Sequence, residues 1–239
     1  IVASSDIDDK LVWFESKEII KISPKVFLQG AYNTENDLMR DDLRGDGDIS
    51  GTQLIPLTSP YTDALVANQS VFTTTGNNAI VDWVYVELRD KNNIISVVAG
   101  TSAFVQRDGD VVGIDGISPL DFVLDADNYY VSISHRNHIA IATDVSASIT
   151  TITSTIDMTL VSNVKGSIDA VNLLEGSIHG MFAGDVNGDG TVNTTDYNGT
   201  IGFLNSSGYL LNDVDMNGTV LTTDLNLFIV KSLNSVKQF

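Results

Sequence analysis

The amino-acid sequence predicts a mainly β protein, an antiparallel β-sandwich followed by a small α-helical unit that carries two acidic loops. The chain up to Thr143 contains many short runs rich in Val, Ile, Tyr and Phe, and clusters of Gly, Asn and Asp separate them. This is the pattern of short antiparallel strands joined by turns. Further along, one acidic segment of twelve residues occurs twice, each time before a helix candidate. Such a repeat predicts a second structural unit.

The composition is that of a folded and strongly acidic protein. Its 239 residues are 43% apolar and 18% charged, enough for one large domain or a medium domain with a small one attached. With 31 acidic and 13 basic residues, the formal net charge is −18. Such a surface repels phosphate groups and anionic lipids but attracts divalent cations. We therefore expect no nucleic-acid partner.

The short apolar runs and the lack of cysteine exclude further classes of protein and of functional site. The runs are far shorter than the ~20 residues that a membrane-spanning helix needs, so we expect no membrane insertion. Without cysteine, disulfides, thiolate metal sites and a cysteine nucleophile are excluded. A secreted chain without disulfides needs another source of stability, and bound metal ions are one candidate.

The strand candidates lie mostly in the first part of the chain. They are the segments 25–32, 79–90, 97–107, 110–116 and 128–143. The Asp-Gly pair at 108–109 lies between two of them and is a strong hairpin signal. The Ser/Thr-rich segment 145–162 is either a linker or one or two closing strands, and we favour strands because apolar residues recur in it.

These patterns divide the chain into three parts. Residues 1–22 are the end of a preceding segment or the first strands, 23–182 form the β-sandwich, and 183–239 form the unit with the repeat. We expect a helical turn over 166–184, where the two larger parts meet. Because the sequence begins with Ile1 rather than Met, we also expect it to be a piece of a longer protein.

The two copies of the acidic segment run from Asp185 to Asp196 and from Asp213 to Asp224, with identical residues at eight of the twelve positions. Acidic or amide side chains stand at positions 1, 3 and 5, glycine at 6, threonine at 7 and aspartate at 12. The predicted metal ligands are Asp185, Asn187, Asp189, Thr191 and Asp196 in the first loop, and Asp213, Asp215, Asn217, Thr219 and Asp224 in the second.

This ligand set fits calcium, which prefers six to eight oxygen ligands. Alternate side chains can point inward, a glycine permits the sharp turn, and the carbonyl of residue 7 and a last carboxylate complete the shell. We therefore expect two Ca²⁺ ions, one in each EF-hand-like loop; the alternative is two Asx-rich turns without metal. Val192 and Val220 at position 8 should bind each loop to an apolar core. Leu221 at position 9 cannot hold a water as Asn193 can, so the second loop should bind more weakly.

The unit resembles the type I dockerin family, which has two duplicated loop-helix units of this kind. After the second loop, Leu225, Phe228, Ile229 and Leu233 fall on one helical face. The resemblance implies that a cohesin could be recognised through positions 10 and 11 of each loop. Those positions hold Thr194 and Thr195 in the first copy and Thr222 and Thr223 in the second. Dockerin-like units also occur in surface proteins that bind no cohesin.

The earlier part of the chain resembles a β-rich module near the C-terminal end of secreted, multidomain surface proteins of Bacteroidota. The resemblance rests on the strings VFLQGAY, MRDDLR, IPLTSPY, VDWVYVELRD, QRDGDVVGIDG, YYVSISHRNHIAI and GMFAGDVNGDG. It implies an extracellular or cell-surface protein, exported by the type IX secretion route, that serves adhesion or assembly. It implies no known reaction.

Three clusters of residues are candidates for catalysis or ligand binding. His135 and His138 would face opposite sides of a regular strand, so we expect structural hydrogen bonds from one histidine and Arg136 at the sandwich edge rather than a metal site. The polar segment 39–51, with Asp41, Asp42, Asp46 and Asp48, is a solvated acidic loop, an acid pair or an additional cation site. Trp83 and Tyr85 should face the core, with a sugar-stacking platform as the alternative.

The sequence thus predicts a non-enzymatic, calcium-stabilised module for adhesion or assembly within a larger secreted protein. Its partner would be a protein or glycan at the cell surface. The alternatives are a true dockerin that binds a cohesin to assemble a polysaccharide-degrading complex, and a carbohydrate-binding module.

Overall fold

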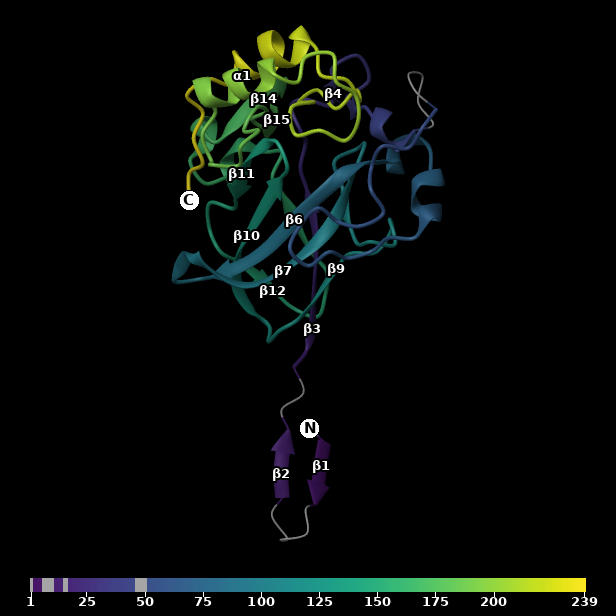
Figure 1. The fold of residues 1–239 in the computed structure, drawn as a ribbon. Helices are drawn as coiled ribbons and strands as arrows, with labels where there is room; N and C mark the ends of the chain where they lie inside the picture. The colour runs from purple at the N-terminus through teal and green to yellow at the C-terminus, as the bar shows by residue number, and fades with distance from the viewer. Residues whose placement is uncertain (1, 6–10, 15–16, 46–50) are drawn as a thin grey trace.

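The computed structural model describes residues 2–5, 11–14, 17–45 and 51–239. As expected, the described chain is mainly β with mostly antiparallel pairing. Strands β1 (Val2–Ser5) and β2 (Leu11–Phe14) pair with each other. The hairpin is drawn in purple in Figure 1.

The larger sheet has six strands in the order β11-β10-β6-β7-β8, with β12 also paired to β10. The strands are β6 (Ile80–Asp90), β7 (Asn93–Gln106), β8 (Val111–Val112), β10 (Asp127–His135), β11 (His138–Ala142) and β12 (Ala147–Ile149). The Asp-Gly hairpin joins β7 to β8, where Gly109 has φ +90° and its N–H donates to the carbonyl of Gln106. This confirms the predicted turn.

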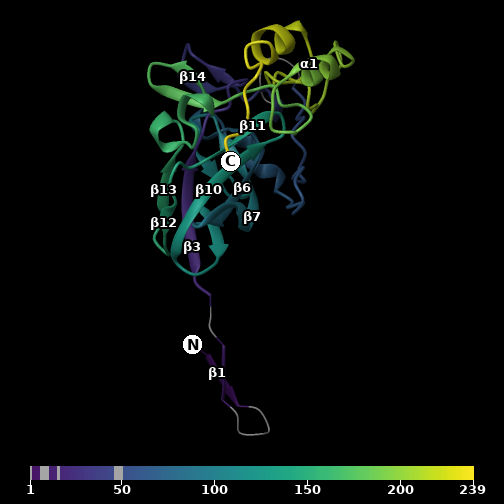
Figure 2. The ribbon, with the colours of Figure 1, turned by 90° about the vertical axis from the view of Figure 1, so that its left-hand side faces the viewer.

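A smaller sheet has the order β13-β3-β9, from β3 (Ile19–Lys25), β9 (Leu120–Val123) and β13 (Ser154–Asp157). In the side view of Figure 2, β3 and β13 lie beside the layer that contains β6 and β7. Buried side chains of both sheets form one hydrophobic core, among them Ile20, Ile22, Leu120, Phe122, Val84, Val86, Leu88, Val131, Ile133 and Ile156. The two sheets therefore form a sandwich.

The larger sheet is covered on its other face as well. There the indole ring of Trp83 is fully buried and its centroid lies 3.9 Å from that of Phe104. The indole N–H donates to the carbonyl of Pro56 at 2.8 Å. The 3₁₀ helix η2 (Gln69–Thr73) contributes Phe72, whose ring lies 5.4 Å from Phe104. Trp83 is thus core, as predicted, whereas Tyr85 is half-buried against Tyr61.

Several boundaries differ from the expectation. The segment 145–162 does form two strands, β12 and β13, but β13 pairs in parallel with β3. The segment 128–143 is a hairpin of β10 and β11 rather than one strand. The boundary at residue 22 falls inside β3, so this part of 1–22 belongs to the sandwich.

The helical turn expected over 166–184 was wrong. After the 3₁₀ helix η5 (Ser167–Asp169), the hairpin of β14 (Val171–Glu175) and β15 (Ile178–Met181) occupies this segment. The glycine at its turn, Gly176, has φ +55°. The other short elements are β4 (Tyr32–Asn33), β5 (Leu38–Met39), and the 3₁₀ helices η1 (Asp42–Arg44), η3 (Gly76–Asn78) and η4 (Val161–Asn163).

The burial of Trp83 gives a first prediction. Trp83→Ala removes a fully buried ring and should lower the free energy of unfolding by about 3–5 kcal/mol, because the surrounding core closes the resulting cavity only in part. Ile95→Ala, at a side chain that is 75% exposed in β7, is the control and should change it by no more than about 0.5 kcal/mol. Urea denaturation followed by circular dichroism measures both. Equal effects of the two changes would contradict the assignment of Trp83 to the core.

Candidate metal centre

The repeat lies against one end of the sandwich, next to β11 (Figure 1, green to yellow). Its two helices are α1 (Thr194–Ile201) and the π-helix η6 (Asp224–Ile229). Ile139 of β11 shares one buried apolar cluster with residues of the repeat: Ala183, Val186, Val192, Val214, Leu225 and Ile229. Phe228 packs against the same cluster, so three of the four residues predicted to share an apolar helical face are found there. The fourth, Leu233, is half-buried and follows the end of η6.

The two loops are related by an internal symmetry. Thr191 in the first loop bridges to Val236, which follows the second helix, and Thr219 in the second loop bridges to Ser207, which follows the first helix. Val192 and Val220 are both fully buried, as predicted for position 8. Each loop is therefore held in part by the chain that follows the other helix.

In the second loop, the three carboxylates converge. Asp213, Asp215 and Asp224 each place a carboxylate oxygen within 4.8 Å of the others, and all three residues are buried. Asp224 accepts hydrogen bonds from the N–H groups of Val214 at 2.7 Å and Leu221 at 2.7 Å. These bonds fix the last carboxylate across the loop from the first two.

The first loop has the same framework. Asp196 accepts from the N–H groups of Val186 at 3.0 Å and Asn193 at 2.9 Å, matching Asp224. Asp185 accepts from the N–H of Gly190 at 3.0 Å, and its other oxygen, Oδ1, is buried without a hydrogen-bond partner. The carboxylate of Asp189 accepts a hydrogen bond from the side-chain amide of Asn187, the neighbouring predicted ligand, at 2.9 Å.

The glycines at position 6 have the backbone conformation that the sequence pattern requires. Gly190 has φ +84° and Gly218 has φ +89°, in the left-handed region where a side chain is strained. The N–H of each glycine donates to the first aspartate of its loop. Asn193 at position 9 is an N-cap, since its side-chain oxygen accepts from the N–H of Thr195 at 2.6 Å.

Both loops concentrate negatively charged carboxylates that are partly or fully buried from solvent. Burial raises the pKa of Asp185 to about 6. Burial also raises the pKa values of Asp213 and Asp215, and the nearby carboxylate of Asp224 adds to both shifts. A divalent cation is the counter-charge that such a group of oxygens accommodates, and the unpartnered oxygen of Asp185 is a free ligand for one. The donor set therefore fits Ca²⁺.

The histidine cluster differs from the expected regular strand. His135 and His138 face each other across a tight hairpin turn, with their Nδ1 atoms 3.0 Å apart. The N–H of Gly30 donates to Nε2 of His138 at 3.1 Å, so the proton of His138 lies on Nδ1. Burial holds the pKa values of both histidines below their ordinary range. Their predicted structural role is confirmed, but at a buried contact.

A buried carboxylate missed by the sequence reasoning lies below this turn. Asp82 of β6 is fully buried and accepts from Nε of Arg136 at 2.9 Å. Nε2 of His135 lies 3.1 Å from Asp82, and the hydroxyl of Tyr209 donates to Asp82 at 2.6 Å. Tyr209 belongs to the segment between the two acidic loops. The only signal in the sequence is a single aspartate within an apolar run.

The acidic segment 39–51 shows ion pairing where it is described. Asp41 is paired with Arg44 at 2.5 Å and lies 3.5 Å from Arg107, while Asp42 lies 3.8 Å from Arg40. Both acids thus have basic neighbours and are largely buried, which differs from the expected solvated loop and argues against an acid pair. Asp46 and Asp48 lie outside the described residues.

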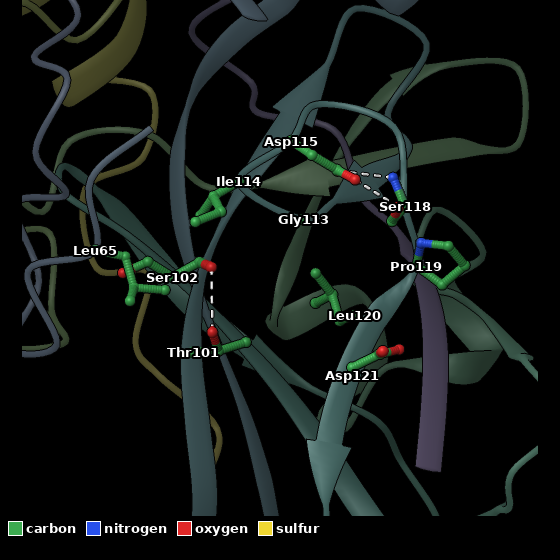
Figure 3. A pocket seen from close by; sticks show the side chains of 10 residues that line it. All are labelled: Leu65, Thr101, Ser102, Gly113, Ile114, Asp115, Ser118, Pro119, Leu120 and Asp121. Atoms are coloured by element: carbon green, nitrogen blue, oxygen red, sulfur yellow. Dashed lines mark hydrogen bonds between the residues drawn. The ribbon is translucent and has the colours of Figure 1, made fainter. Parts of the chain in front are cut away.

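A cavity of about 350 Å³ lies elsewhere, between β7 and β9 (Figure 3). Its acidic side chains are engaged by the protein. Asp115 accepts from the hydroxyl of Ser118 at 2.5 Å and from the N–H of Ile117 at 3.0 Å, and Asp121 pairs with Lys21 at 2.6 Å. These two carboxylates therefore do not converge on a ligand position.

Comparison with known proteins identifies no family. No protein-family model matches the chain, and no curated protein does. Structural similarity is found to a C-terminal interface mutant of a type II cohesin–X–dockerin complex from Acetivibrio cellulolyticus, with a TM-score of 0.45 and 16% identity over 91% of this chain and 97% of that chain. An N-terminal interface mutant of the complex gives a TM-score of 0.38 and 20% identity over 64% and 82%. Similarity at this level assigns the chain to no family.

None of the helices in the described residues has the length and the apolar character of a membrane-spanning segment.

The network around Asp82 gives a second prediction. Asp82→Asn leaves the buried Arg136 without its counter-charge and should lower the free energy of unfolding by about 3–5 kcal/mol. Tyr209→Phe keeps the ring that stacks under Arg136 and removes one hydrogen bond to a charged group, so it should cost about 1.5–3 kcal/mol. Chemical denaturation compares the two. If Asp82→Asn costs no more than Tyr209→Phe, the ion pair is not the main contact.

Proposed function

We propose that the chain is a non-enzymatic, calcium-stabilised module for adhesion or assembly within a larger secreted protein, and that each acidic loop binds one Ca²⁺. The observation that carries the calcium proposal is the convergence of three buried carboxylates in the second loop. The ions would be held by Asp185, Asn187, Asp189, Thr191 and Asp196, and by Asp213, Asp215, Asn217, Thr219 and Asp224.

Charge explains why the ions would stabilise the fold. Each loop contains three aspartates, so its formal charge of −3 becomes −1 when Ca²⁺ binds. Without a counter-ion, the mutual repulsion of these carboxylates opposes folding. Outside cells, modules of this kind need affinities of only about 10⁻⁴–10⁻³ M. A weaker second site remains a prediction, with Leu221 as its cause.

The proposal of a non-enzymatic role is supported by the histidines. His135 and His138 are buried and bonded to each other, to Asp82 and to the backbone of Gly30. They serve the fold, and so are not placed to act on a substrate from solvent. We further propose, on the sequence resemblance alone, that the parent is a Bacteroidota surface protein exported by the type IX route.

A true dockerin is the second candidate. Thr194, Thr195 and Thr222 are exposed at the start of the two helices, and Thr223 is half-buried. This exposure leaves the positions that would contact a cohesin accessible. Pull-down of the calcium-loaded chain on immobilised cohesins tests this candidate, and binding should disappear when Thr194 and Thr222 are changed to Asp together.

The carbohydrate-binding candidate is weakened by the position of its aromatic ring. Trp83 is fully buried, so the suggestion that it forms a sugar-stacking platform was wrong. Stacking on a sugar requires an accessible ring face. Tyr85 is half-buried against Tyr61 and offers less surface than the platform would need.

Chelation gives the third prediction. EGTA should unfold the segment 185–239 at a lower temperature than the sandwich, because at 100-fold excess over Kd each bound ion contributes about 2.7 kcal/mol. Calorimetry of the whole chain with calcium and with EGTA measures the shift. The double change Asp213→Asn and Asp224→Asn should remove part of the calcium response, whereas Asp121→Asn, in an exposed ion pair, should leave it unchanged. An identical melting profile in calcium and EGTA would refute the proposal.

A fourth prediction concerns pH. Calcium binds the ionised carboxylates, and the raised pKa of Asp185, about 6, means that protons compete at mildly acidic pH. The affinity for calcium should therefore rise between about pH 5 and 7 and level off above pH 7. Below the pKa of a competing carboxyl group, each pH unit should change the affinity roughly tenfold. Isothermal titration in two buffers of different ionisation enthalpy should show proton release near pH 6. Asp185→Asn should reduce that release, and affinity independent of pH would contradict the role of these carboxyls.

A further inference from the structure

We propose that a surface of the sandwich around Gly30, Arg40 and Asn137, called the seat below, holds the second acidic loop in place. Docking of the loop on this seat and calcium binding within the loop would then be coupled equilibria. The first loop would bind its ion independently of this seat. The inference rests on the proposed calcium binding and adds to it a role for sandwich residues that ligate no metal.

The clearest sign of a seat is a residue of the second loop that enters the sandwich core. Met216, at position 4, is 2% exposed and belongs to the same hydrophobic core as the two sheets. Position 4 of the first loop is Gly188, which is exposed. Met216 also adopts φ +58°, a conformation that a side chain disfavours. Its insertion therefore offsets a backbone cost that glycine at the same position would avoid.

The seat itself requires close contact between backbones. A Cβ atom at Gly30 would lie 1.8 Å from the carbonyl oxygen of Val214 and 2.9 Å from its carbonyl carbon. Val214 stands between the ligands Asp213 and Asp215. Gly30 is itself fixed, since its N–H donates to His138. Any side chain at residue 30 must therefore displace the part of the loop that carries two ligands.

Polar side chains of the sandwich hold the same stretch. The side-chain amide of Asn137, in the turn between β10 and β11, donates to the carbonyls of Leu211 and Asp213, both at 2.9 Å. Arg40 donates to the carbonyl of Asp215. These hydrogen bonds hold the backbone at and before Asp213 and at Asp215. The carboxylates of these two predicted ligands are therefore positioned by the sandwich as well as by their own loop.

The chain just before the first loop also contacts this turn, since the N–H of Gly184 donates to the carbonyl of Asn137 at 2.8 Å, but the centre of the first loop has other neighbours. The N–H of Lys237 donates to the carbonyl of Gly190 at 2.8 Å, and the N–H of Val192 donates to the carbonyl of Ser235 at 3.0 Å. Its central part is thus paired with the C-terminal segment. Because the coupling of two linked processes is reciprocal, only the second loop should transmit calcium binding to the seat.

Calcium titration of the full chain by isothermal calorimetry tests the proposal. Met216→Gly removes the inserted side chain and relieves the backbone strain, yet it should weaken one of the two sites by about tenfold or more, within the range of typical couplings. Gly30→Ala should weaken the same site, and the second site should keep its affinity. Gly113→Ala is the matched control, because a Cβ there meets its nearest neighbours at an ordinary 3.5 Å.

Hydrogen exchange of the full chain supplies a second readout. Adding calcium should slow exchange at residues 26–31 and 137–139 of the wild type, and Met216→Gly should abolish this slowing while leaving β6 protected. Should Gly30→Ala fail to fold by circular dichroism, Met216→Gly alone decides. Two unchanged sites in Met216→Gly would overturn the coupling but leave calcium binding intact, whereas a wild type that binds no calcium would overturn both.

Discussion

The buried carboxylate of Asp82 is the central contact between the sandwich and the C-terminal unit that carries the acidic loops. Burial alone would raise the pKa of Asp82, but Arg136 and the hydrogen bonds from His135 and Tyr209 hold it well below its ordinary range. These partners come from the β10–β11 turn and from the segment between the acidic loops. An unpaired charge at this depth costs several kcal/mol. The sandwich supplies the counter-charge itself through Arg136, and Tyr209 adds a hydrogen bond from the segment between the acidic loops.

The same region shows how a chain with a net charge of −18 assembles an acidic unit on its own surface. Arg40 donates to the backbone carbonyl of Asp215 and lies 3.9 Å from its carboxylate, and Arg136 donates to the backbone carbonyl of Leu210. Their charge lowers the local repulsion, and the carboxylates keep oxygens for a cation. Burial raises the pKa of Asp213 although the nearby Arg136 acts to lower it.

What the sequence predicted, and what it could not, follows from the range of the interactions. Strands β6 and β7, the Asp-Gly turn and the twelve-residue repeat are local patterns, and all three were found. The turn at Arg136 and Asn137 has no glycine, so the sequence pattern continues through it as one strand. The glycine at residue 176 is a local turn signal that fits the β14–β15 hairpin better than the expected helical turn. The parallel pairing of β13 with β3 and the burial of Asp82 depend on residues far apart in the chain, which periodicity does not reveal.

The two copies of the repeat share the positions that build the loop and differ where they meet different surroundings. Positions 1, 6, 7, 8 and 12 are identical, and they supply carboxylates, the turn glycine and the buried valine. Position 4 differs most in size, with Gly188 exposed in one loop and Met216 inserted into the core in the other. Since position 4 carries no predicted ligand, it is free to respond to what lies outside the loop. Its side chain therefore follows the neighbouring surface, and the second loop is fitted to the sandwich while the first pairs with the C-terminal segment.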